Sequence, residues 1–240
     1  MGIIRDIATK TMTEEKRKMA KTDYFAFYVG RPLSYILTVP FLRFGIRPNV
    51  VSFISFFPPV IGFILVGFGN NLILKLIGWV MFFLWNLLDG VDGNIARYTK
   101  CSSKMGSVWD AASGYWAAIM LFMAMGVGSY YGDFSAMHSN RIISVVLGSF
   151  SSLFCLFPRL IMHKKLSTLK DEESVKQVKD RGSFGPIRII ALNLTSFAGF
   201  MQVVMLITIF FKIMDIFTIF YFFLNLIIML ASLRSILTFK

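Results

Sequence analysis

Three acidic residues stand in a part of the chain that is otherwise strongly apolar. Asp89, Asp92 and Asp110 lie among long runs of Leu, Phe, Met and Ala. A carboxylate at membrane depth loses its hydration, and this cost must be offset by a partner or a bound cation. We therefore treat these three residues as candidates for function.

The spacing of the acids indicates which chemistry they could do. On a helix, residues three, four and seven apart share a face, so Asp89 and Asp92 would line one stripe together with Gly93 and Ala96. Glycine and alanine leave room for a ligand to approach the backbone beside two hard oxygen donors. Such a stripe could hold a divalent cation next to a nucleotide.

Two further residues could complete such a site. Arg97 lies at the edge of the stripe, and its permanently charged guanidinium suits a phosphate group. Asp110 begins the next predicted helix after a short turn, so it could reach the cation from across the groove. Together these residues indicate metal-assisted chemistry on a phosphate ester.

The elements that must position these residues are membrane-spanning helices. Hydrophobic residues make up 56% of the 240 residues, and Phe alone contributes 26, which is more than one soluble core of this length needs. A helix crosses a bilayer with about 20 apolar residues. The sequence predicts an all-α integral membrane protein with six transmembrane helices, at Val50–Phe68, Leu72–Leu88 with a polar continuation to Arg97, Met105–Val127, Ile142–Met162, Ile187–Phe211 and Ile216–Leu237.

A shorter apolar run precedes the first span. Residues 31–44 include Arg43 and are followed by Arg47, which indicates an amphipathic helix that lies in the membrane interface. The predicted division is therefore a cytoplasmic N-terminal segment with this interfacial helix, residues 1–46, and a six-helix transmembrane domain, residues 47–240.

The distribution of positive charge predicts the orientation in the lipid bilayer. With six spans, all of the 25 Lys and Arg residues except Lys75, Arg141 and Lys212 fall on one side, which is then the cytoplasmic side. Both termini and the candidate site are expected there, whereas Lys75 and Asp215 are placed at the opposite surface. The net charge of +12 follows from this topology and from attraction to anionic lipids, so we expect no nucleic-acid partner.

The same residues carry a family resemblance. The segment Asp89-Gly-Val-Asp92-Gly93-Asn-Ile-Ala96-Arg97 is followed after eight residues by Gly106 and after three more by Asp110. This pattern resembles the signature of the CDP-alcohol phosphotransferases, also called CDP-alcohol phosphatidyltransferases. Weaker similarity extends to Arg31-Pro-Leu-Ser, to Gly45-Ile-Arg-Pro-Asn49 and to the number of spans.

The resemblance implies an enzyme that transfers a substituted phosphate from a CDP-alcohol, such as CDP-diacylglycerol, to an acceptor alcohol and releases CMP. It implies that Asp89, Asp92 and Asp110 bind one or two Mg²⁺ or Mn²⁺ ions. It also implies a homodimer. The residues that would accommodate or bind the nucleotide and its phosphates are Gly93, Ala96, Arg97 and Gly106.

One position departs from the family's pattern. A fourth Asp stands in the family four residues after the third, where it binds a second metal ion and serves as the base, but this chain has Gly114. Deprotonation of the acceptor would then fall to Asp110, to a metal-activated water or to the acceptor itself. Three interpretations stay open: a subfamily with a different acceptor or base, a member with reduced or lost activity, and an altered variant. Gly114 could also serve close helix packing.

Residues outside the motif offer further candidates. Arg159 and Arg188, at the cytoplasmic ends of the fourth and fifth spans, could bind an anionic group of the acceptor, or they could simply flank the membrane. Asn49 could contact the nucleotide or cap the first span. His163 lies in a basic cluster with no sequence partner that indicates catalysis.

Two classes of function are compatible with these residues. The first is a CDP-alcohol phosphotransferase. The second is a protein that lacks this activity, either a scaffold that retains a CDP and metal site or a cation transporter, because carboxylates also line ion pathways. The position of the acids at one end of their spans, beside Arg97, argues against transport.

Overall fold

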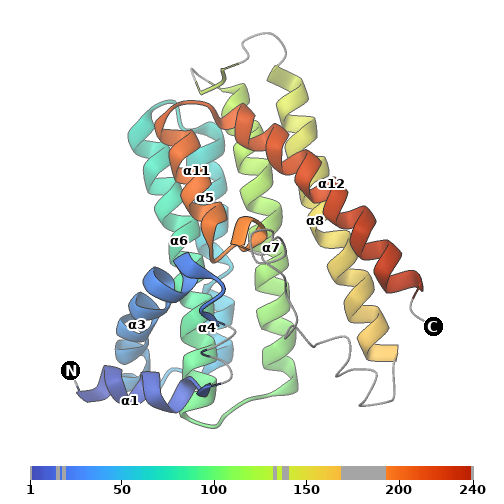
Figure 1. The fold of residues 1–240 in the computed structure, drawn as a ribbon. Helices are drawn as coiled ribbons and strands as arrows, with labels where there is room; N and C mark the ends of the chain where they lie inside the picture. Colours follow the sequence, from blue (N-terminus) through green and yellow to red (C-terminus); the bar gives the residue numbers. More distant parts are fainter. Residues whose placement is uncertain are drawn as a thin grey trace.

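The computed structural model describes residues 2–14, 17, 20–131, 134–136, 141–168 and 193–238. Every regular element within these ranges is a helix, so the predicted all-α class is confirmed (Figure 1). Within the same ranges, five helical segments are long and apolar enough to cross a membrane, as an integral membrane protein requires. They are Pro48–Phe68, Leu72–Tyr98, Lys104–Tyr130, Ile142–Thr168 and Met214–Leu237.

The helices form a bundle around one central member. α7 runs through the middle of Figure 1, with α4, α5 and α6 on one side and α8 and α12 on the other. The elements in chain order are α1 (Gly2–Thr11), the short π-helix η1 (Ala26–Gly30), α3 (Arg31–Arg43), α4 (Pro48–Ile54), α5 (Phe57–Phe68), α6 (Leu72–Tyr98), α7 (Lys104–Tyr130), α8 (Arg141–Thr168), α11 (Phe200–Phe210) and α12 (Met214–Thr238).

The first predicted span is a broken helix. Ser55 and Phe56 separate α4 from α5. Pro58 and Pro59 follow at once, and proline fits the first turn of a helix because it has no backbone N–H to contribute to the interior. The break is held from α7, where Trp116 Nε1 donates a hydrogen bond to Phe56 O at 3.2 Å.

The two helices that carry the motif acids both begin with side-chain caps. At the start of α6, Asn71 Oδ1 accepts a hydrogen bond from Leu74 N at 2.9 Å. At the start of α7, Ser103 Oγ accepts one from Gly106 N at 2.9 Å. Because only residues 99–103 connect the two helices, the end of α6 and the start of α7 lie next to each other, as the sequence predicted.

The predicted fifth span, Ile187–Phe211, is not a continuous helix where the structure describes it. Residues 187–192 lie outside the described ranges, and α11 covers only 11 residues. A helix of that length rises about 16 Å, roughly half the thickness of the hydrocarbon core. A sixth crossing is therefore not confirmed.

The segment before α11, residues 193–199, contains one helical turn and otherwise irregular backbone. Side chains from two long helices hold its carbonyl groups: Tyr221 Oη donates to Leu194 O at 2.9 Å, and Asn86 Nδ2 donates to Ala198 O at 3.3 Å. Irregular backbone at membrane depth is tolerated where protein groups satisfy it or where it lines a cavity. We call residues 193–199 the pre-α11 segment.

Among its described residues, the N-terminal region includes the two α-helices α1 and α3, of which α3 covers the predicted amphipathic run. Its location in the membrane interface stays a prediction. α1 has no counterpart among the predicted elements; it packs on α3 and α6 and buries Ile7. Between these helices the chain also holds the pre-α11 segment, because Asn193 Oδ1 accepts from Tyr24 N at 3.1 Å and Ser196 Oγ donates to Asp23.

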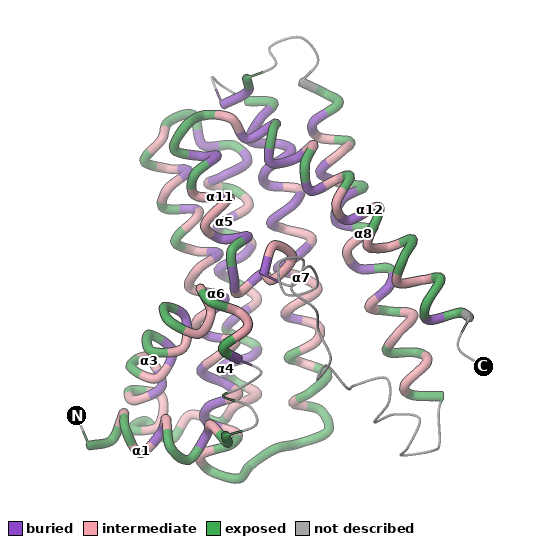
Figure 2. The backbone as a smooth tube through the Cα atoms, in the orientation of Figure 1, coloured by how far each residue is buried: buried purple, intermediate pink, exposed green. Residues whose placement is uncertain are grey.

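Burial is concentrated on α7. In its most apolar window 56% of the residues are buried, against 22% in α8 and in α12, and Figure 2 shows the same contrast along the tubes. Phe122 of α7 packs against the ring of Tyr221 with centroids 5.8 Å apart. α8 and α12 thus keep exposed apolar faces, as membrane helices at the edge of a bundle do.

Two charged residues that the sequence placed at the opposite surface are buried instead. Lys75 is 0% exposed and Asp215 is 1% exposed. Lys75 Nζ donates to Val66 O at 2.7 Å and to Gly128 O at 3.3 Å. These carbonyl groups lie in the last turns of α5 and α7, where a helix leaves them without internal partners. The lysine is therefore a cap shared by two helices.

Candidate active site

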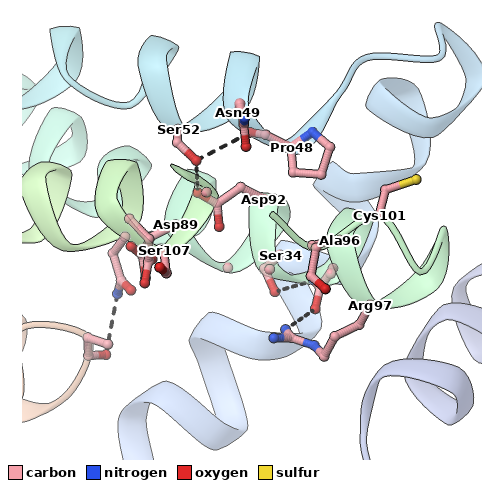
Figure 3. A pocket seen from close by; sticks show the side chains of 18 of the residues that line it. Ser34, Pro48, Asn49, Ser52, Asp89, Asp92, Ala96, Arg97, Cys101 and Ser107 are labelled. Atoms are coloured by element: carbon pink, nitrogen blue, oxygen red, sulfur yellow. Dashed lines mark hydrogen bonds between the residues drawn. The ribbon is translucent and has the colours of Figure 1, made fainter. Parts of the chain in front are cut away.

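The motif residues line one pocket of about 410 Å³, a size typical of small-ligand sites. α6 contributes the largest share of its wall, and the N-terminal parts of α3, α4 and α7 close it (Figure 3). The structure thereby brings together the candidates that sequence spacing selected. The lining includes Asn49, Asp89, Asp92, Gly93, Ala96, Arg97, Gly106 and Asp110, together with Arg31, Ser34 and Ser52.

The three acids reach this pocket from two helices. Asp89 and Asp92 lie on α6, and Asp110 lies in the second turn of α7. Asp92 is 6% exposed and accepts a hydrogen bond from Ser52 Oγ at 2.5 Å. The one ion pair between described residues lies in α1, so no Lys or Arg in the described part of the chain forms an ion pair with the pocket acids.

The donor chemistry of the acids fits a hard divalent cation, because Mg²⁺ and Mn²⁺ prefer oxygen ligands. Asp89, Asp92 and Asp110 all line the same pocket. They are not yet gathered, since the described residues include no group of three or more His, Cys, Asp or Glu side chains that could hold a metal ion. A cation bound here would have to draw the carboxylates together.

Arg97 is positioned by a polar chain that leads to α3. Its Nη2 donates to Asn94 Oδ1 at 3.2 Å, and Asn94 Nδ2 donates to Thr38 Oγ1 at 3.2 Å and to Ser34 Oγ at 3.3 Å. A Cβ atom at Gly93 would lie 3.0 Å from both Nη atoms. Gly93 therefore makes room for the guanidinium, which keeps further N–H donors for an anion.

Asn49 and Gly106 meet where α4 and α7 begin. A Cβ atom at Gly106 would lie 3.1 Å from Asn49 Oδ1 and 3.2 Å from Ser103 Oγ, so glycine permits this close approach. The interpretation of Asn49 as a helix cap is wrong, because the N-cap of α4 is Arg47 and no side chain caps that helix. Asn49 lines the pocket instead.

A second pocket of about 630 Å³ adjoins the first. Four residues line both pockets: Asn86, Asp89, Asp110 and Ala198. Beyond these residues the second pocket is bounded by further residues of α6 and α7 and by α8, α12 and the pre-α11 segment. We call the two cavities the motif pocket and the α8 pocket. They offer two binding spaces that meet at the same two carboxylates.

Gly114 lines the α8 pocket, one helical turn after Asp110. A Cβ atom at Gly114 would have no heavy atom within 4 Å. No described element of this chain packs closely on Gly114, so the helix-packing interpretation is not supported. A side chain at position 114 would extend into open space beside Asp110.

Comparison with known protein families shows which family this chain resembles. The family model of the CDP-alcohol phosphatidyltransferases matches residues 45–235. This chain belongs to the CDP-alcohol phosphatidyltransferase family. The family transfers a substituted phosphate from a CDP-alcohol to an acceptor alcohol. Among curated proteins, no sequence matches the chain.

The matched residues include both carboxylates that the two pockets share and almost all of the α8 pocket. They leave out α1, η1 and α3, so Arg31 and Ser34 reach the motif pocket from outside the matched residues. The residues that hold Arg97 in place through Asn94 therefore come partly from the N-terminal region.

Of the two arginines predicted to bind the acceptor, the structure describes only one. Arg159 lines the α8 pocket, and its Cζ lies 5.0 Å from the ring centroid of Phe197. Arg188 lies outside the described residues. Arg159 is thus the predicted acceptor residue that the structure places beside Asp89 and Asp110.

Sequence reasoning missed residues that complete the site from other elements. Ser52 bonds Asp92 from α4, and residues 195–198 line the α8 pocket. A second missed feature is the pair formed by Tyr115 of α7 and His163 of α8, with Oη 2.9 Å from Nδ1. The polar run that begins at Asn193 was a signal for the irregular segment. No spacing rule could have paired residues 48 positions apart.

Proposed function

We propose that this chain is an active CDP-alcohol phosphotransferase that transfers a substituted phosphate to an acceptor alcohol and releases CMP. The observation that carries the proposal is the placement of Asp89, Asp92 and Asp110 around one pocket with Arg97 and without a described cationic partner. Carboxylates left unneutralised beside an oriented guanidinium suit a cation together with a polyphosphate.

The motif pocket is the proposed site for the CDP-alcohol. Arg31 and Arg97 both line it and can present guanidinium N–H groups to the diphosphate oxygens. Asp89, Asp92 and Asp110 would hold Mg²⁺ or Mn²⁺. A bound divalent cation would neutralise the diphosphate and polarise its P–O bonds. The cytidine would lie toward the small residues of α6 and the start of α4.

The α8 pocket is the proposed site for the acceptor. It meets the motif pocket at Asp89 and Asp110, so an alcohol bound there would lie next to a phosphorus held by the motif pocket. Arg159 offers a cation to an acceptor that carries a phosphate or carboxylate. Its guanidinium lies over the Phe197 ring, a contact that helps to position it.

We also propose that both pockets face the cytoplasm, where the positive-inside rule places the basic ends of the long helices. The short turn that carries Lys100 and Lys104 lies at the mouth of the motif pocket, because Cys101, Ser102 and Ser103 line it. The family resemblance adds a homodimer to this proposal.

A scaffold that binds CDP without turnover is the second candidate, and Gly114 favours it because the carboxylate of the family's pattern is absent there. Cation transport has less support. The acids lie at one end of α6, while its other end contains Lys75, which is fully buried in the bundle.

The test uses the full chain in proteoliposomes, with CDP-diacylglycerol or CDP-choline as donor and a panel of acceptors that includes serine, inositol, glycerol 3-phosphate and diacylglycerol. CMP release is measured by chromatography with Mg²⁺ and with EDTA. We expect CMP release with at least one combination of donor and acceptor, and only when Mg²⁺ is present. CDP binding without release would identify a scaffold, and neither binding nor release would contradict the proposal.

A further inference from the structure

We propose that His163 of α8 accepts the proton of the acceptor alcohol and that Tyr115 of α7 orients its ring. The inference rests on the proposed function and deepens it, because it names the proton acceptor of a site in which position 114 carries no side chain. His163 would be a catalytic residue, whereas Tyr115 would be a positioning residue.

The geometry places the pair at the wall of the acceptor site. His163 and Tyr115 both line the α8 pocket together with Asp89, Asp110 and Gly114. Tyr115 Oη lies 2.9 Å from His163 Nδ1 and 3.5 Å from Nε2. Because Gly114 leaves open space around its Cα, no side chain at that position stands between the pair and the two acids.

The chemistry of the pocket needs such a group. An alcohol is a weak nucleophile until a base takes its proton, and the best bases can take up a proton near neutral pH. Asp89 and Asp110 are the proposed cation ligands, and Arg159 is permanently charged. Among the described residues that line the α8 pocket, His163 is the one imidazole.

The titratable groups described near His163 come from the wall of the α8 pocket and from the next positions of α8, Lys164 and Lys165. Those that line the same pocket are Asp89 from α6, Asp110 and Tyr115 from α7, and Arg159 from α8 itself. α12 contributes Ser232 and Ile236, and the pre-α11 segment contributes residues 195–198; none of these titrates near neutral pH.

The proposed step balances as follows. The acceptor hydroxyl gives its proton to His163 Nε2, and its oxygen forms a bond to the phosphorus that carries the donor's alcohol. The P–O bond between that phosphorus and CMP breaks, and CMP leaves with the electron pair of this bond. The imidazolium then returns the proton to solvent, which the exposed ring can reach.

Tyr115 Oη can accept a hydrogen bond from His163 Nδ1 in the tautomer that this step requires. When Nδ1 carries the hydrogen and donates it to Tyr115 Oη, Nε2 keeps its lone pair free for the acceptor. The hydrogen bond also fixes the ring plane, with the ring centroids 5.7 Å apart. Loss of the phenolic oxygen should misorient the base without removing it.

The test compares His163→Gln and Tyr115→Phe with the wild-type chain, using CDP-diacylglycerol and the acceptor that gives the fastest CMP release. Lys164→Gln is the matched control, because Lys164 is exposed on the same helix and does not line either pocket. CDP binding to each variant is measured in parallel, so that a folding defect is recognised. Gly114→Asp is combined with His163→Gln.

We expect His163→Gln to lower kcat by about 100-fold or more, to leave CDP affinity unchanged and to remove the acid limb of the pH profile of kcat. Tyr115→Phe should lower kcat by a smaller factor with little change in KM for the donor. In the double variant, the carboxylate at position 114 should restore at least part of the rate.

Several results would overturn the inference. One is wild-type kcat and an unchanged pH profile in His163→Gln; another is an equal loss of CDP binding and turnover, which would indicate a structural role. A cost of His163→Gln that is the same with Gly or Asp at position 114 would also contradict it. If the wild-type chain releases no CMP with any pair, the proposed function itself fails, which is a distinguishable outcome.

Discussion

The charged residues at the two ends of α6 lie in opposite surroundings. Near its start, Lys75 is fully buried and donates to two carbonyl groups, with its Nζ 4.5 Å from the centroid of the Phe134 ring. Toward its end, Asp89 and Asp92 line a pocket together with Asp110 and have no described cationic partner. The same helix thus carries one charged side chain that is hydrogen-bonded by the protein itself and two charged side chains that face a cavity.

Asp215 extends the comparison to an acid. It is 1% exposed and accepts hydrogen bonds from Ser135 Oγ at 2.9 Å and from the N–H groups of Ala136 and Ile216, each at 3.0 Å. A buried charge that the protein itself hydrogen-bonds from several sides has a structural role, whereas a charge that faces a cavity without an ion-pair partner is available to a ligand. Burial alone therefore does not identify a functional acid in this bundle.

The largest expected effect on activity comes from replacing an acid that faces the pocket rather than an acid that is hydrogen-bonded within the fold. Asp89→Ala should lower CMP release by about 1,000-fold or more, because several kcal/mol of charge stabilisation depend on the metal site. Its melting temperature should be unchanged or higher, since a poorly partnered carboxylate is removed from the interior. CMP release and thermal unfolding are measured on the same preparation.

Asp215→Ala is the matched control for Asp89→Ala. It should lower stability by roughly 1 to 3 kcal/mol, because its donors lose their acceptor, and it should leave the activity of the folded fraction unchanged. If the two variants had the same effects on stability and activity, the distinction between structural and functional acids would fail.

Lys75→Met should come next in size. It leaves the carbonyl groups of Val66 and Gly128 without their donor and removes a cation from two helix C-termini. We expect a loss of roughly 1 to 3 kcal/mol in stability, with CDP binding retained. Thermal unfolding would show it, and an equal or higher melting temperature than the exposed control Lys164→Met would argue against the shared cap.

Arg97→Lys should have the smallest effect of the three. The ammonium keeps the charge but loses the fork that Asn94 orients above Gly93, so CDP affinity should fall by about 10-fold. Arg43→Lys, on the exposed end of α3, is the control. The measurement is CDP titration at fixed Mg²⁺, and equal affinities for both variants would remove Arg97 from the diphosphate site.

The sequence predicted those parts of the site that lie on α6 and at the start of α7, the helix that follows it. The spacing of Asp89, Asp92 and Arg97 depends only on helical periodicity, and Asp110 follows after a short turn, so local rules sufficed. Five of the six predicted spans correspond to apolar helical segments long enough to cross a membrane, for the same reason.

The rest depended on contacts between distant parts of the chain. The partners of Lys75 lie 9 and 53 residues away, and hydropathy alone placed this residue at a surface. The pre-α11 segment needs Asn86 and Tyr221 to satisfy its backbone, which a window of apolar residues cannot reveal. Gly114 could be interpreted only once the space around it was known.

The most direct test of the account is calorimetric titration of CDP into the full chain, with and without Mg²⁺, for the wild type and for Asp89→Ala. Three carboxylates that face one pocket without a described cationic partner predict binding by the wild type that requires Mg²⁺ and is lost in the variant. CDP binding that is unchanged by Mg²⁺ and by the substitution, or no binding at all, would contradict the central claim that these acids form a cation and nucleotide site.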